Sequence, residues 1–120
     1  MNAANLALRF LLELAALSGF GILAWSKFDG WWRYLAVIII VAVVMTIWGV
    51  FAVPDDPSRS GNAPIPVPGI LRLVLEIAIL VGGAYAFHGS GHSYVALILA
   101  ALIALHYALS GERIAWLLQQ

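Results

Sequence analysis

Three shortages in this 120-residue sequence exclude whole classes of protein. The chain has no cysteine, so it forms no disulfide bond and offers no thiolate nucleophile or metal ligand. Its six basic and six acidic residues cancel, which excludes the basic surface expected of a nucleic-acid-binding protein. Charged residues make up only 10% of the chain, far below the roughly 25% of soluble domains, which excludes an ordinary soluble fold.

Apolar residues are correspondingly abundant in the sequence. They make up 63% of the sequence, and the mean hydropathy is +0.98. A domain of this size leaves about a third of its surface exposed, so in water many of these side chains would remain uncovered. The composition therefore predicts an integral membrane protein, with the lipid bilayer as its main partner and no nucleic-acid partner.

Four apolar stretches are each long enough for the roughly 20 residues that a helix needs to cross a bilayer. They cover approximately residues 3–25, 34–53, 68–87 and 94–110. We predict an all-α fold, a four-helix bundle of two helical hairpins that forms a single transmembrane domain over residues 1–120. Prolines and polar residues predict a solvated linker over residues 54–67, and residues 111–120 are expected to form a short interfacial tail.

The distribution of basic residues predicts the orientation of the bundle. An even number of spans places both termini on one side of the membrane. Lys27 and Arg33 would lie on the other side, where tryptophan and other aromatic residues around residues 25–34 form an interfacial belt. The remaining basic residues belong to the terminal side, and by the positive-inside rule this favours both termini in the cytosol.

A motif with arginine and glutamate four residues apart occurs twice. Residues 9–15 read RFLLELA, and residues 72–78 read RLVLEIA. Charged residues are rare within spans, so the recurrence of both at one spacing is a specific signal. Because each copy lies in the first helix of a hairpin, the two hairpins are predicted to be parallel repeats, related by a pseudo-twofold axis along the membrane normal.

These four charges are the candidate functional site. Four-residue spacing puts Arg9 and Glu13 on one face of a helix, and Glu13 lies roughly 15 Å along that helix, near the middle of the bilayer. Facing lipid, the four groups would cost of order 10 kcal/mol, so they are expected to face inward. We predict that the first and third helices lie side by side, so that Arg9 reaches Glu76 and Arg72 reaches Glu13. Each arginine is also expected to reach the glutamate four residues later on its own helix.

Two interpretations of this tetrad stay open on the sequence. In the first, the protein is non-enzymatic and the tetrad is a structural lock that fixes the register of the helices. In the second, the protein is an oligomeric proton-coupled transporter or channel for small molecules, in which Glu13 and Glu76 exchange an arginine partner for a proton. A cavity reaching both carboxylates would favour transport, and a dry, fully hydrogen-bonded tetrad would favour the lock.

The remaining signals are weaker. His88 and His92 flank a Gly-Ser-Gly turn and are the candidate metal ligands, but two imidazoles without a third ligand do not make a site. We therefore expect no metal and no cofactor. The chain has no recognisable catalytic constellation, so no enzymatic activity is expected. Alanines at every fourth position from Ala96 to Ala108 allow close helix approach, within the bundle or in a homo-oligomer.

Three segments carry a resemblance to a known family. They are residues 5–14 (NLALRFLLEL), 48–54 (WGVFAVP) and 71–76 (LRLVLE). With these segments the chain resembles the YrdB-like family of small bacterial membrane proteins of unknown function. The resemblance implies a four-helix fold in the bacterial cytoplasmic membrane, and it supplies no activity and no small-molecule ligand.

Overall fold

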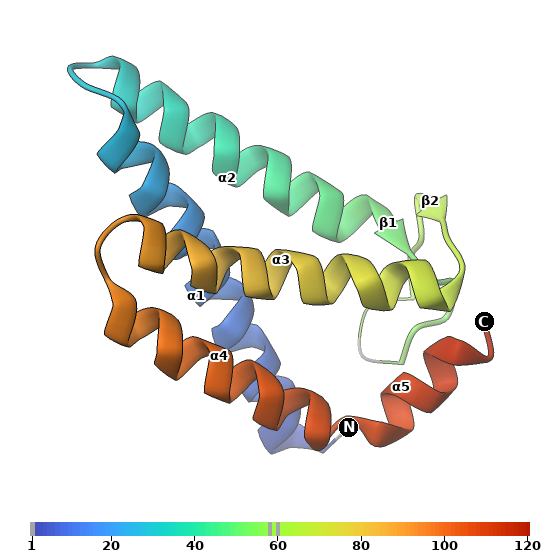
Figure 1. The fold of residues 1–120 in the computed structure, drawn as a ribbon. Helices are drawn as coiled ribbons and strands as arrows, with labels where there is room; N and C mark the ends of the chain where they lie inside the picture. Colours follow the sequence, from blue (N-terminus) through green and yellow to red (C-terminus); the bar gives the residue numbers. More distant parts are fainter. Residues whose placement is uncertain (1, 58, 60) are drawn as a thin grey trace.

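The computed structural model of the chain describes residues 2–57, 59 and 61–120, so residues 1, 58 and 60 of the predicted domain and linker lie outside the described part. The described part is mostly helical, which confirms the helical character expected from the sequence (Figure 1). The helices are α1 (Ala3–Lys27), α2 (Trp32–Val50), α3 (Gly69–Gly89), α4 (Ser93–Ala108) and α5 (Gly111–Leu118). Two short strands, β1 (Phe51–Ala52) and β2 (Ile65–Pro66), pair in parallel.

Local sequence explains where these helices begin and turn. The side chain of Asn2 accepts a hydrogen bond from the backbone N–H of Asn5 at 2.8 Å and so caps the start of α1. Pro68 precedes α3. Proline has no backbone N–H, but the first turn of a helix does not require one for its internal hydrogen bonds. The α1–α2 and α3–α4 turns contain Gly30 and Gly91, both in the left-handed region, with φ of +62° and +91°. Glycine adopts this conformation without steric cost, which lets both hairpins reverse within a few residues.

The helices form two hairpins, α1 with α2 and α3 with α4, and the hairpins pack together through α1 and α3. Helix α1 packs most extensively against α3 and α2, and α3 also packs against α4 and α5. Figure 1 shows the two hairpin turns at one end of the molecule, whereas the linker, α5 and both chain termini lie at the other end. The first and third helices therefore lie side by side, and the Arg-Glu motifs near their beginnings share one end of the fold.

Within the described residues, α1, α2 and α3 are each long and apolar enough to cross a membrane. Helix α4 has 16 residues and meets this criterion only when it is joined to α5, from which it is bent by 69°. The structure thus contains three such spans, or four if the bent pair counts as one. The helix ends differ from the expected stretches by a few residues, most of all at α2, which ends at Val50 where the chain enters β1.

The described residues of the linker 54–67 are exposed or partly exposed, except for Asp56. The backbone N–H of Val67 donates to the carbonyl oxygen of Ala52 at 2.9 Å, which extends the β1–β2 pair. Asp56 is only 2% exposed although it lies among prolines and polar residues, while its neighbour Asp55 is exposed. The cause is tertiary, because the carboxylate of Asp56 faces an arginine of α5.

Small residues let α1 and α3 come into backbone contact. The buried core is built from Leu12, Ala16, Leu80, Ala84 and Ile103. Beside it, a Cβ atom placed on Gly83 would lie 2.5 Å from the Cα atom of Ala16, which is closer than side chains pack in proteins. This close crossing brings the motif of α1 within reach of the motif of α3.

Gly83→Ala is expected to destabilise the protein by about 1–2 kcal/mol, because the added methyl group must push two helix backbones apart. The matched control is Gly49→Ala, since a Cβ atom on Gly49 meets nothing within 4 Å. Denaturant titration of both variants in detergent micelles, followed by circular dichroism, measures the difference. Equal stabilities of the two variants would contradict the close crossing.

Candidate functional site

The carboxylate of Glu76, on α3, is the centre of a buried polar cluster. Its side chain is fully buried. Arg9 reaches it from α1 with both terminal nitrogens, Nη2 to Oε1 at 2.7 Å and Nη1 to Oε2 at 3.3 Å. Arg72, one turn earlier on α3, donates from Nε to Oε1 at 2.8 Å. The paired contacts of Arg9 give this ion pair the geometry of a bidentate guanidinium–carboxylate interaction.

The C-terminal helix and the linker also contact this centre. Arg113, on α5, donates from Nη2 to Oε1 of Glu76, and its Nη1 lies 2.5 Å from Oδ1 of Asp56. Tyr107, on α4, donates its hydroxyl to Oε2 of Glu76 at 3.3 Å. Side chains from α1, α3, α4 and α5 therefore meet at one carboxylate, and Asp56 adds the linker through Arg113.

Arginines of the cluster also satisfy the open carbonyl groups at the end of α2. Nη1 of Arg72 donates to the carbonyl oxygens of Trp48 and Phe51, both at 2.6 Å. Arg59 donates to the carbonyl oxygens of Trp48 and Gly49 at 3.0 and 3.3 Å. The last carbonyls of a helix have no partner within it and carry partial negative charge, so guanidinium groups stabilise this end.

The indole ring of Trp48 adds an aromatic face to the cluster. The guanidinium carbons of Arg9 and Arg72 lie 5.1 and 4.7 Å from its centroid. Both distances are within the range of cation–π interactions. Trp48 thus links the end of α2 to the charged groups of α1 and α3.

A second polar group ties the beginning of α1 to the end of α4. The side-chain amide of Asn5 donates to Oγ of Ser110 at 2.8 Å, and Oδ1 of Asn5 lies 2.8 Å from Nδ1 of His106. Ser110 in turn donates to the carbonyl oxygen of His106 at 2.6 Å. Asn5 lies on the same helical face as Arg9, so the polar face of α1 continues from this group into the cluster.

The structure brings together only part of the predicted tetrad. Arg9 contacts Glu76 and Arg72 contacts Glu76, as expected. The expected pair of Arg72 with Glu13 is absent from the ion pairs of the described residues, and Arg72 instead also contacts the end of α2. Glu13 contacts Nε of Arg9 at 3.4 Å and its side chain is 27% exposed. The two copies of the motif are therefore alike in sequence and unlike in surroundings, because Arg113 contacts Glu76.

Several members of the cluster were missed by sequence reasoning. They are Trp48, Asp56, Arg59, Tyr107 and Arg113. None belongs to the repeated motif. Asp56 stands beside an exposed aspartate of the same charge, and nothing in the local sequence separates the two. One feature of the sequence could have indicated that the tail contributes to the cluster. Arg113 is a basic residue close to the apolar residues Ile114, Trp116 and Leu117.

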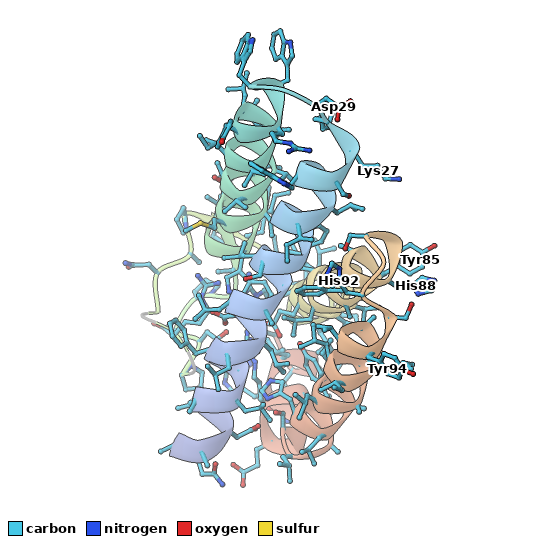
Figure 2. The ribbon with its side chains drawn as sticks, turned by 90° about the vertical axis from the view of Figure 1, so that its left-hand side faces the viewer. Lys27, Asp29, Tyr85, His88, His92 and Tyr94 are labelled. Atoms are coloured by element: carbon cyan, nitrogen blue, oxygen red, sulfur yellow. The ribbon has the colours of Figure 1, made fainter. Side chains whose placement is uncertain are left out.

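His88 and His92 lie at the α3–α4 turn, away from the cluster. Nδ1 of His88 lies 3.0 Å from the hydroxyl of Ser93, and Nδ1 of His92 lies 3.3 Å from that of Ser90. Figure 2 shows both histidines with Tyr85 and Tyr94 at this turn, apart from the labelled side chains of the α1–α2 turn. Within the described residues, no group of three or more His, Cys, Asp or Glu side chains could hold a metal ion.

A small cavity lies beside the cluster between α1, α2 and α3. Its volume is about 210 Å³, and Glu13 and Trp48 are among its lining residues. Glu76 is fully buried and does not line this cavity. The two repeated carboxylates therefore differ chemically, since Glu76 is saturated by donors and Glu13 faces open space.

Comparisons with known proteins place the chain among uncharacterised relatives. The model of a family described as "Protein of unknown function (DUF2568)" matches residues 7–104. "Uncharacterized protein YrdB" of Bacillus subtilis (strain 168) is 46% identical over 120 residues, which cover all of this chain and 98% of that relative. No solved structure matches. The resemblance expected from residues 5–14, 48–54 and 71–76 is confirmed.

Proposed function

The chain belongs to the DUF2568 family of proteins of unknown function, and we propose that it is a small, non-enzymatic integral membrane protein whose helices are held together by the cluster around Glu76. One observation carries this proposal. The charged groups within the long helices turn inward to each other, while most large apolar side chains on the same helices face outward. A protein in water has the opposite distribution, whereas a protein in lipid requires this one.

Helix α2 supports the membrane location most clearly. All of its residues are described, and Val44 is the one that is buried. Ile38 and Ile39 are 65% and 53% exposed, and the rest of the helix is almost entirely apolar. Soluble monomers rarely expose contiguous apolar patches beyond a few hundred Å², so lipid is the surrounding that fits α2.

Aromatic residues at the α1–α2 turn support a membrane boundary there. Trp31 and Trp32 are exposed and stacked, with ring centroids 4.1 Å apart. The guanidinium carbon of Arg33 lies 4.2 Å from the ring centroid of Trp25. Tryptophan and basic residues of this kind sit at the headgroup level. We propose that this turn faces away from the cytosol, and that the opposite end, with both termini, faces the cytosol of a bacterial cell.

Single-cysteine labelling tests the membrane location and the orientation. Because the natural chain has no cysteine, Asp29→Cys and Gln119→Cys each provide one exposed thiol, at opposite ends of the fold. In intact bacterial spheroplasts, a membrane-impermeant maleimide is expected to label Asp29→Cys at once and Gln119→Cys only after permeabilisation. The unmodified protein is the unlabelled control. Recovery of the protein in the soluble fraction, or labelling of both variants before permeabilisation, would contradict the proposal.

The distribution of contacts favours the structural lock over proton-coupled transport through both carboxylates. Glu76 has donors from Arg9, Arg72, Arg113 and Tyr107 and no exposed surface, as a lock requires. The partial exposure of Glu13 and the cavity beside it support the alternative, but the cavity does not reach Glu76. Any movement of ions or small molecules through this protein would therefore involve Glu13 and not Glu76.

A further inference from the structure

We propose that Glu13 and the cavity beside it bind an apolar monovalent ammonium ion, which is a small amine with an alkyl or aryl body. The site goes beyond the structural role of the cluster, because Glu13 is the repeated carboxylate that has only one long ion-pair contact and borders a cavity. Glu13 is the only charged residue among the described side chains that line the cavity. The others are apolar or aromatic and include Leu17, Met45 and Trp48.

The bundle makes little use of Glu13. Both terminal nitrogens of Arg9 bind Glu76, so Glu13 is the second and weaker carboxylate partner of Arg9. The remaining contact, from Nε of Arg9 to Oε1 of Glu13, is 3.4 Å long, whereas charge-assisted hydrogen bonds are about 2.7–2.9 Å. Beyond this contact, the side chain of Glu13 has no hydrogen bond among the described residues. Its carboxylate therefore keeps the capacity to accept hydrogen bonds from a ligand.

The lining of the cavity determines the chemistry of the ligand. Small-molecule sites are mostly apolar, with a few polar groups that fix the orientation of the ligand. An ammonium group offers three N–H donors to the carboxylate of Glu13, and its apolar body matches the remaining walls. A divalent metal ion would need several oxygen ligands, which these walls do not supply. A single carboxylate with one long contact from Arg9 favours a monovalent cation over a divalent one.

The size and depth of the cavity narrow the ligand further. At about 30 Å³ per water molecule in the liquid, 210 Å³ corresponds to about seven waters or to a small amine. Glu13 lies about 15 Å along α1 from Ala3, given a rise of about 1.5 Å per residue. At that depth the carboxylate is out of reach of amines in lipid headgroups. The geometry therefore favours a free amine over a phospholipid.

Equilibrium binding in lipid nanodiscs tests this site. The probe is 2-phenylethylammonium, titrated calorimetrically into the full-length protein in phosphatidylcholine nanodiscs, with empty nanodiscs as the blank. Glu13→Gln is expected to weaken binding at least tenfold, because it removes the charge and keeps the shape. The matched control is Glu112→Gln on the exposed side of α5, which is expected to leave binding unchanged. Neutral 2-phenylethanol is expected to bind the natural protein at least tenfold more weakly than the amine.

A second variant keeps the test decisive if Glu13→Gln fails to fold. Met45, on α2, is 55% exposed and lines the cavity, so Met45→Trp fills the space without changing a charge. It is expected to weaken binding of the amine at least tenfold. Equal binding by Glu13→Gln and the natural protein, or no effect of Met45→Trp, would overturn the proposal. Loss of binding in phosphatidylethanolamine nanodiscs would also overturn the proposal, because a lipid amine would then be the occupant of the cavity. A dimer in which the partner covers the cavity and the amine does not bind would overturn it as well.

Discussion

Glu76→Gln is expected to destabilise the protein by about 3–5 kcal/mol. The substitution keeps the shape of the side chain and removes the one charge that Arg9, Arg72 and Arg113 share. All three guanidinium groups are buried, so water does not replace the lost carboxylate. Arg9 keeps Glu13 and Arg113 keeps Asp56, whereas Arg72 loses the carboxylate with which it pairs among the described residues. An uncompensated buried charge costs far more than the net worth of the ion pair that it leaves behind.

The repeated motif supplies the matched control for this substitution. Glu13→Gln makes the same chemical change at the equivalent position of α1, where the carboxylate is partly exposed and has one long contact. A loss of at most about 1 kcal/mol is expected there, as for partly solvated ion pairs. Denaturant titration in detergent micelles, followed by circular dichroism, compares the two variants with the natural protein. Equal losses would show that the cluster is not centred on Glu76.

Arg113→Gln is expected to release α5 from the bundle, with a cost to local stability of about 2–3 kcal/mol. Arg113 is 5% exposed and joins α5 both to Glu76 and to Asp56 of the linker. Without it, α5 keeps the packing of Leu117, which is fully buried where its backbone meets Gly69 at the start of α3. That contact alone orders a short helix weakly, because isolated helices of this length are unstable.

Hydrogen exchange measures this release directly. At tenfold per 1.4 kcal/mol, the amides of α5 are expected to exchange roughly 30- to 140-fold faster in Arg113→Gln, while those of α1 and α3 change little. Arg33→Gln is the control, because Arg33 stacks on Trp25 at the opposite end of the molecule. Unchanged protection of α5 in Arg113→Gln would show that Leu117 and not the ion pairs docks this helix.

Most of the helical architecture could be predicted from local features of the sequence. The long apolar stretches, the asparagine before α1, Pro68 before α3 and the glycine-containing turns all act within a few residues of each helix end. The pairing of α1 with α3 could also be predicted, because an ion pair between Arg9 and Glu76 removes both charges from lipid, where each would be costly. The end of α2 was predicted less well, because its chain leaves the helix to pair with residues 65–66.

Membership of the candidate site depended on contacts that local sequence does not encode. Asp55 and Asp56 are adjacent and chemically identical, yet one is exposed and the other is buried against Arg113. Arg113 itself reaches Glu76 only because the chain bends by 69° between α4 and α5. In the bent position, the backbone of Leu117 packs against Gly69 of α3, a contact that exists only in the assembled helices.

The shortage of charge and the repeated Arg-Glu motif were sufficient, by themselves, to place charged groups inside long apolar helices. That conclusion follows from the cost of exposing charge to apolar surroundings, which applies to any fold of this sequence. Only the tertiary structure distinguished Glu76 from Glu13. Two identical motifs acquire different roles because the linker and α5 pack at one of them, and Arg113 then completes the environment of Glu76 while Glu13 borders a cavity.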